Sequence, residues 1–218
     1  MTDKIQLYSL ATPNGQKVSI ALEELGIDYD AHKINIMEDD QFTDEFIKIN
    51  PNSKIPAIID PNGPNGESIN IMESGAILLY LAEKFEKLIP KDPVHRNETI
   101  QWLFFQMASV GPMFGQFGHF FKYATEKCEH PYPKERYSNE VKRLLKVLDD
   151  RLEGREYLVA EEYSIADIAT FPWVSCLSEF YKAEEHLNLD SFKNVKRWHS
   201  KCSSKPASIK GSKVCGFD

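Results

Sequence analysis

The sequence has no long uninterrupted run of apolar residues and no excess of basic ones. A membrane-spanning helix needs about 20 consecutive apolar residues, and a secretory signal has an apolar core behind a basic start, whereas this chain begins Met-Thr-Asp-Lys. We therefore expect no membrane partner and a cytoplasmic location. The 33 Asp and Glu residues outnumber the 26 Lys and Arg residues, which gives a formal net charge of −7. This balance disfavours nucleic acid as the main partner.

Cysteine is scarce and irregularly spaced. The four cysteines form no CxxC pair, and the six histidines form neither an HExxH motif nor a cluster with cysteine. Structural zinc sites use such spacings, and disulfide frameworks are typical of short secreted chains. We therefore predict reduced thiols and no metal site.

The first 87 residues alternate between strand and helix patterns. Strand-like segments lie at 5–10, 29–36, 57–60 and 68–72. Apolar residues recur at helical spacing within 18–25, 42–49 and 74–85. The resulting order is βαβαββα, and a Pro-Asn-Gly-Pro-Asn-Gly turn joins the last two strands as a hairpin. We therefore predict an α/β domain with a mixed sheet over residues 1–87.

The remainder of the chain shows helical periodicity only. The proline-containing segment 88–94 is predicted to be a linker, and residues 95–218 are predicted to form an all-helical domain. Helical segments are expected at about 95–126, 133–152, 165–177 and 192–203. Pro112 should kink or divide the first of them. Ser164 and Asp167 are predicted to form a capping box at the start of the third, which is a structural role.

Two junctions in the first domain carry the strongest functional signal. Ile55-Pro56 stands where a helix gives way to a strand, and X-Pro bonds are those for which the cis form is accessible. A cis turn there can present the N–H and C=O of Ile55 to an extended peptide. Glu73 and Ser74 stand where a strand ends and an apolar helix begins, so helix N–H groups and the Ser74 hydroxyl can receive a carboxylate. Together the junctions predict a pocket for a small acidic peptide.

This pairing resembles the glutathione site of the glutathione S-transferase family, whose layout is also an α/β domain followed by a helical one. The resemblance covers nearly the whole chain. It implies a thioredoxin-like first domain, glutathione as cosubstrate and a homodimer. It further implies that Glu73 holds the ammonium and Ser74 the carboxylate of the γ-glutamyl group. Ile55 would pair its backbone with the cysteinyl part, and Lys54 and Gln41 would meet the glycyl carboxylate.

The turn Thr-Pro-Asn-Gly at 12–15 joins the first strand to the first helix. Thioredoxin-like folds often carry a reactive cysteine in this turn, but here Thr12 takes its place, so the thiol must come from the ligand. Lowering a thiol pKa by ~2 units requires about 2.7 kcal/mol. A hydrogen bond to a charged group supplies ~1.5–3 kcal/mol. Thr12, Asn14 and the N–H groups of the helix start are therefore predicted to stabilise a thiolate, whereas Tyr8 and Ser9 precede the turn and are interpreted as strand packing.

Three short segments look like the Nu-class and Ure2-like branch of the family, namely 12–18, 111–116 and 135–137. That likeness favours a glutathione-dependent thiol–disulfide oxidoreductase, in which bound glutathione thiolate attacks a disulfide and a second glutathione resolves the mixed disulfide. Arg136 would contact the ligand or the second glutathione, although a solvated helix face explains it equally well. Conjugation of glutathione to electrophiles is an alternative, because some of the Phe and Met residues of segment 104–121 could line an apolar cleft for the electrophile. We expect most of these residues in the core. A Ure2-like regulatory or binding protein is the non-enzymatic alternative.

Overall fold

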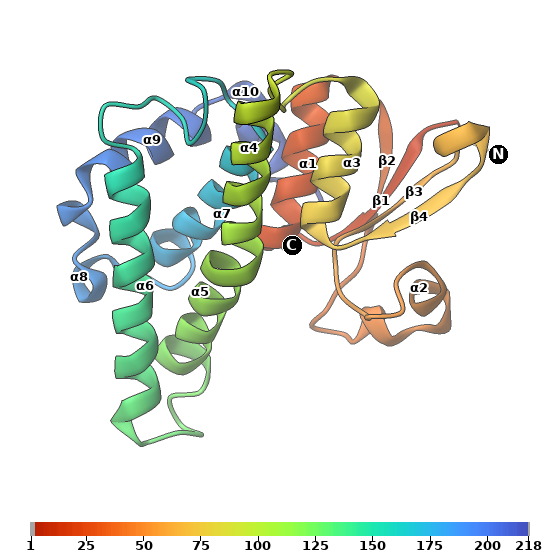
Figure 1. The fold of residues 1–218 in the computed structure, drawn as a ribbon. Coiled ribbons are helices and arrows are strands. Elements are labelled where there is room, and N and C mark those ends of the chain that lie inside the picture. Colours follow the sequence, from red (N-terminus) through yellow and green to blue (C-terminus); the bar gives the residue numbers. More distant parts are fainter. Residues whose placement is uncertain (1–2, 218) are drawn as a thin grey trace. The chain divides into compact units, whose positions relative to one another are not determined.

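A computed structural model describes residues 3–217, which fall into two units (Figure 1). The first unit combines residues 3–87 with the C-terminal segment 205–217, and the second unit comprises residues 88–204. No helix among the described residues is both long and apolar enough to cross a bilayer.

A four-stranded mixed sheet forms the centre of the first unit, in the order β2-β1-β3-β4. The strands are β1 (Ile5–Ser9), β2 (Tyr29–Lys33), β3 (Ala57–Asp60) and β4 (Ile69–Met72). Strand β1 pairs in parallel with β2, and β3 runs antiparallel to both β1 and β4. The predicted mixed sheet is confirmed, but β2 ends at Lys33 rather than at residue 36. Met37 and Glu38, just beyond that point, are exposed and belong to a turn.

Helices α1 (Pro13–Leu25) and α3 (Ser74–Phe85) pack side by side, as Figure 1 shows. Their inward residues are inaccessible to solvent and form the core together with Leu7 of β1. These residues are Val18, Ala21, Leu22, Ile77, Leu78 and Leu81. Burial of each large aliphatic side chain is worth roughly 1.5–3 kcal/mol. The short helix α2 (Asp44–Ile49) follows the 3₁₀ turn η1 (Asp40–Phe42), and a second such turn, η2 (Pro64–Gly66), lies in the hairpin.

The C-terminal helix α10 (Pro206–Gly211) belongs to the first unit because it packs on α1. The Ser19 hydroxyl donates to the carbonyl of Gly211 at 2.7 Å, and Lys210 pairs with Glu23 at 2.7 Å. A Cβ on Gly211 would lie 2.7 Å from the backbone of Ile20, so the close approach requires glycine. The predicted helical domain 95–218 is therefore wrong at its C-terminal end. The periodicity of a short helix does not identify the helix against which it packs.

Six α-helices build the second unit, within the residues that the structure describes. They are α4 (Pro93–Phe105), α5 (Gly111–Gly118), α6 (Pro131–Arg151), α7 (Ile165–Glu179), α8 (Glu184–Leu187) and α9 (Lys193–Ser203). Two π-helical turns, η3 (Gln106–Val110) and η4 (His119–Tyr123), follow α4 and α5, and a 3₁₀ turn, η5 (Leu189–Ser191), precedes α9. Pro112 lies in the first turn of α5, so the predicted division of the helical segment is confirmed. The wider turn before it lets the N–H of Gly111 reach the carbonyl of Gln106.

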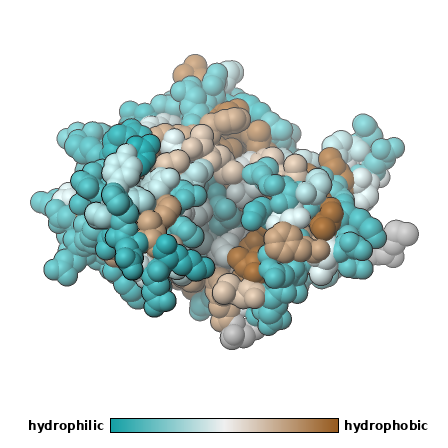
Figure 2. Space-filling model, turned by 90° about the horizontal axis from the view of Figure 1, so that it is seen from below, coloured by the Kyte–Doolittle hydropathy of each residue, from teal (hydrophilic) through white to brown (hydrophobic). Residues whose placement is uncertain are grey.

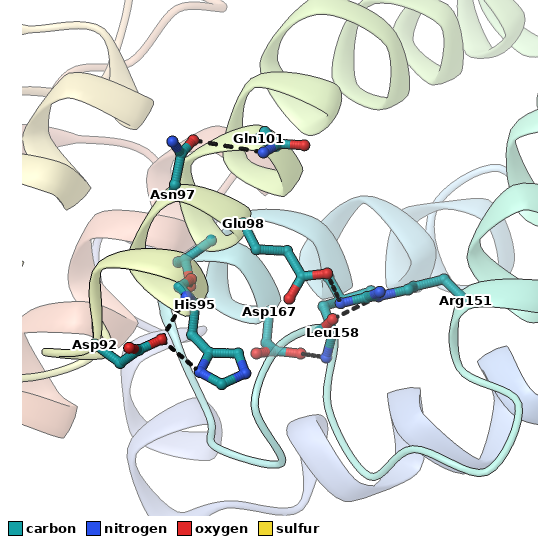
Figure 3. Close-up of polar contacts among 9 residues, drawn as sticks. Asp92, His95, Asn97, Glu98, Gln101, Arg151, Leu158 and Asp167 are labelled. Atoms are coloured by element: carbon teal, nitrogen blue, oxygen red, sulfur yellow. Dashed lines mark hydrogen bonds and ion pairs between the residues drawn. The ribbon is translucent and has the colours of Figure 1, made fainter.

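Helix α7 is buried along most of its length, and its start is held by the fully buried carboxylate of Asp167. One carboxylate oxygen accepts from the N–H of Leu158 at 3.0 Å, as Figure 3 shows. The same oxygen accepts from the indole of Trp198 at 2.8 Å. The other accepts from the N–H and the hydroxyl of Ser164, so the predicted capping box is confirmed. Burial raises the pKa of Asp167 to about 6 against the effect of these donors.

The aromatic segment 104–121 is less buried than its sequence suggested. Of its Phe and Met residues, Phe114 and Phe117 are inaccessible, whereas Phe104 is 64% exposed. The expectation that most of them are core is wrong, because the residues follow one another so closely that they cover several sides of the helical path rather than one face.

Candidate functional site

The topology of the sheet brings three segments of the first unit to one edge. The start of β3 is paired with the ends of β1 and β4, since Ala57 lies opposite both Tyr8 and Met72. The turn after β1, the Ile55-Pro56 junction before β3 and the Glu73-Ser74 junction after β4 therefore converge. Most of the site residues predicted from the sequence lie in these segments.

Thr12 is the N-cap of α1 and has extended backbone angles. Its hydroxyl oxygen accepts a hydrogen bond from the N–H of Gly15 at 3.3 Å, which leaves the hydroxyl proton to be donated elsewhere. Asn14, half-buried, is in the first turn of the same helix. The turn is tight, because a Cβ on Gly15 would lie 1.9 Å from the carbonyl oxygen of Leu10. The arrangement offers a hydroxyl and an amide at a helix N-terminus, as an anion requires.

The peptide bond between Ile55 and Pro56 is cis. The loop before it is fixed by the buried side chain of Asn50, whose amide donates to the carbonyl of Lys54 at 2.6 Å. Among residues 3–217, Ile55 takes part in no backbone–backbone hydrogen bond, so its N–H and C=O can pair with an extended ligand. Lys54 is exposed beside it.

The junction between β4 and α3 has an unusual backbone. Glu73 has φ 68° and ψ 114°, a conformation that L-residues rarely adopt and that costs of order 1–3 kcal/mol. Its side chain makes no capping hydrogen bond to α3, so the first N–H groups of that helix are not capped by it. Ser74, the next residue, is only 3% exposed. Strain of this kind is concentrated at ligand sites, which supports a binding role for the junction.

Sequence reasoning missed Lys17, which is fully buried in α1. Its ammonium donates to the hydroxyl of Ser74 at 3.2 Å and so connects the starts of α1 and α3. Burial lowers the pKa of Lys17 to about 7, while the carboxylate of Glu73 acts in the opposite direction. The available signal was the helical spacing of Lys17 with the apolar residues Ile20 and Ala21, which places it on the buried face.

The two other residues predicted to contact the ligand, Gln41 and Arg136, differ in burial. Gln41 is 8% exposed, its amide N–H₂ lies 3.4 Å from a carboxylate oxygen of Asp39, and its carbonyl oxygen has no partner among the described residues. Arg136 belongs to α6 in the second unit, where it is exposed and lines a cavity of about 690 Å³. Met113, Tyr132, Glu135, Tyr137, Asn139, Glu140 and Arg143 also line this cavity.

Tyr8 and Ser9 lie within β1, before the turn that carries Thr12. The ring of Tyr8 stacks on His32 with a centroid separation of 4.6 Å, and burial raises the pKa of its phenol. Ser9 is 2% exposed and its hydroxyl lies 3.3 Å from the carbonyl of Leu10. Among the described residues, no three His, Cys, Asp or Glu side chains gather as a metal site would require.

The fold and the converging segments define a thioredoxin-like domain joined to an all-helical one. Comparison with known proteins agrees. The glutathione S-transferase N-terminal domain family matches residues 11–84, and the glutathione S-transferase C-terminal domain family matches residues 107–206. The disulfide-bond oxidoreductase YghU of Escherichia coli (strain K12) is 46% identical over 215 residues, which cover 95% of this chain and 73% of YghU.

Two solved structures are similar over almost the whole chain. A glutathione transferase from Pseudomonas putida, with one glutathione disulfide bound per subunit, has a TM-score of 0.95 and 53% identity, covering 97% of this chain and 92% of its own. A glutathione transferase from Burkholderia graminis, with two glutathione molecules bound per subunit, has a TM-score of 0.95 and 53% identity, covering 96% and 88%. The chain therefore belongs to the glutathione S-transferase family of enzymes, and the predicted family and fold class are confirmed.

Proposed function

We propose that this enzyme is a glutathione-dependent thiol–disulfide oxidoreductase. The observation that carries the proposal is the convergence of the Thr12 turn, Ile55 and the Glu73-Ser74 junction at one edge of the sheet, where the turn has no cysteine of its own. The similarity to YghU and to a structure with bound glutathione disulfide supports the same activity.

The binding roles follow from the chemistry of each group. Ser74 and the N–H groups of α3 receive the γ-glutamyl carboxylate, and Glu73 receives the γ-glutamyl ammonium. Ile55 pairs its backbone with the cysteinyl residue. The buried amide of Gln41 and the ammonium of Lys54 receive the glycyl carboxylate.

The reaction consists of two thiol–disulfide exchanges. Thr12 and Asn14 donate hydrogen bonds to the glutathione sulfur and so stabilise the thiolate, which attacks one sulfur of the substrate disulfide. A sulfur–sulfur bond to glutathione forms, and the other substrate sulfur leaves as a thiolate that takes up a proton. A second glutathione thiolate then attacks the glutathione sulfur of the mixed disulfide. The products are glutathione disulfide and the reduced substrate, so two electrons pass from two glutathione molecules to one disulfide. Arg136 is assigned to the second glutathione, and the cytoplasm, which is rich in reduced glutathione, is the assigned location.

A homodimer is part of the proposal. Several large apolar side chains of the second unit are exposed, among them Val94 (72%), Phe104 (64%) and Tyr132 (57%). Apolar patches also interrupt the hydrophilic surface on the face that Figure 2 shows. Such groups are common in protein interfaces. Sedimentation analysis should give about twice the mass of the 25.0 kDa chain.

The test of the function is disulfide reduction by glutathione, followed through glutathione reductase and NADPH consumption. Thr12→Val should lower turnover with a small disulfide by at least tenfold and raise KM for glutathione much less. Thr43→Val is a matched control, because Thr43 caps α2 through the same type of bond to the N–H three residues later, at 3.4 Å. Background turnover of the wild-type protein, together with clear conjugation of an electrophile, would favour the transferase alternative.

A further inference from the structure

The side chain of Lys17 is a buried ionisable group in the core of the first unit. It is fully inaccessible to solvent within α1, next to the apolar residues that build the core. An ammonium group in such a place loses its hydration and is costly to keep charged. A methionine of similar length would fill the space without that cost. The position therefore points to a role in function rather than in packing.

The contact between Lys17 and Ser74 determines the direction of the Ser74 hydroxyl. An ammonium group has three donors and no acceptor, so in the 3.2 Å contact the Ser74 oxygen is the acceptor. The hydroxyl proton of Ser74 must then point away from Lys17. A hydroxyl that accepts from an ammonium group is also polarised and becomes a better donor to an anion. Ser74 is thus prepared to donate to a carboxylate at the start of α3.

The position of the charge fits the same ligand group. A carboxylate bound at the Ser74 hydroxyl would have the ammonium of Lys17 behind that hydroxyl, separated from solvent by protein. Attraction between charges is stronger there than in water, because the surroundings are less polarisable. The nearby carboxylate of Glu73 favours the charged form of Lys17. Lys205, which precedes α10, and Lys210 within α10 are paired with Glu24 and Glu23.

We infer that Lys17 is a positioning residue for recognition of the γ-glutamyl α-carboxylate, acting through the orientation of Ser74 and through buried positive charge. The inference rests on the proposed function, since it assumes that Ser74 binds this carboxylate of glutathione. Lys17 itself does not touch the ligand. It makes the site specific for a ligand that carries a carboxylate at that point.

The experiment is calorimetric titration of two ligands into wild-type, Lys17→Met, Ser74→Ala and double-variant protein. The ligands are glutathione and its analogue γ-aminobutyryl-cysteinyl-glycine, which lacks only the α-carboxylate. Lys17→Met should weaken glutathione binding at least tenfold and change the affinity for the analogue less than twofold. In the Ser74→Ala background the same substitution should weaken glutathione binding less than threefold. Circular dichroism establishes that each variant is folded.

The outcomes separate this inference from the function on which it rests. Equal losses for both ligands in Lys17→Met, or a full tenfold loss in the Ser74→Ala background, would show a merely structural role and overturn the inference. So would unchanged glutathione binding in Lys17→Met while Ser74→Ala loses affinity. Wild-type protein that binds neither ligand would overturn the proposed function as well. Lys17→Gln, which keeps an amide donor group without the charge, carries the same test if Lys17→Met does not fold. It should show an intermediate loss for glutathione only.

Discussion

At the scale of single residues, the two buried ionisable side chains Lys17 and Asp167 differ in their surroundings and in the part of the fold that they connect. Asp167 is surrounded by four donors that belong to the protein itself. Lys17 donates to Ser74, and its burial lowers its pKa to about 7. The first arrangement holds a helix start, a loop and a tryptophan together. The second lies beside the proposed glutathione site, and perturbed pKa values are common at functional sites.

Replacement of Asp167 by alanine should lower the free energy of unfolding by about 3–5 kcal/mol. The substitution leaves four donors in a buried region without their acceptor, and each such group costs about 1–3 kcal/mol, partly offset because a buried carboxylate is removed. Urea unfolding followed by the fluorescence of Trp198 and the other tryptophans is the measurement. Asp190→Ala, at an exposed carboxylate paired with Lys196, is the control and should change stability little. A loss below about 1 kcal/mol for Asp167→Ala would contradict the structural role.

The lowered pKa of Lys17 has a defined effect on stability. In the unfolded chain lysine titrates near 10.5, and in the folded protein Lys17 titrates near 7. Below pH 7 the group is charged in both states, so folding bears the full cost of burying it. Between these values the unfolded chain binds more protons than the folded one, so wild-type stability rises with pH, by at most about 1.4 kcal/mol per pH unit.

Lys17→Met removes this dependence. The variant should exceed the wild type in stability at pH 7, and its advantage should shrink by about 2–3 kcal/mol between pH 7 and pH 9.5. Urea titrations of both proteins at the two pH values give the difference directly. An advantage that stays constant, or grows with pH, would show that the pKa of Lys17 is not lowered by burial.

At the scale of single elements, Gly15 at the start of α1 has less space for a side chain than Gly115 inside α5. A Cβ on Gly15 would collide with the Leu10 carbonyl at 1.9 Å and with the Ser9 hydroxyl at 2.5 Å. Gly15→Ala should therefore displace the turn that holds Thr12, lower stability by about 1–3 kcal/mol and greatly reduce disulfide reduction. On Gly115 the nearest atom to a Cβ is a ring carbon of Trp173 at 3.4 Å.

Gly115→Ala serves as the matched control. Alanine favours a helix over glycine by about 1 kcal/mol, so this variant should keep or slightly gain stability and retain its turnover. The measurements are the unfolding midpoint and the turnover of Gly15→Ala and Gly115→Ala, each compared with the wild type. Equal effects at the two glycines would contradict the importance of the close approach at Gly15.

Elements whose signals are local were predictable. Helix α3 and strand β3 have the predicted bounds, because apolar spacing and flanking turns are encoded within a few residues. The capping box at Ser164 belongs to the same class. The partner of Lys17 was not predictable, since Ser74 lies 57 positions away and the contact depends on how α1 packs on α3. Exposure of Phe104 likewise depends on tertiary packing rather than on its own spacing.

At the scale of the whole molecule, the first unit is completed by both ends of the chain. The segment 205–217 returns after the second unit and packs on α1. The carbonyl of Cys215 accepts from the N–H of Ala11 at 2.9 Å, immediately before Thr12, and the amide of Gln16 donates to the carbonyl of Ser212. The C-terminal segment therefore supports the turn that carries the proposed chemistry, although it contributes no predicted contact to glutathione.

Deletion of residues 206–218 should weaken the first unit selectively. The three tryptophans, Trp102, Trp173 and Trp198, all lie in the second unit, so their fluorescence reports that unit alone. Hydrogen exchange followed by mass spectrometry should show faster exchange in peptides from β1, α1 and α3, while the fluorescence midpoint in urea changes little. Gly211→Val keeps the segment but creates a clash with the backbone of Ile20, and it should reproduce the exchange pattern of the deletion. If exchange rises equally in the second unit, or if Gly211→Val has no effect, then docking of α10 on α1 does not stabilise the first unit in particular.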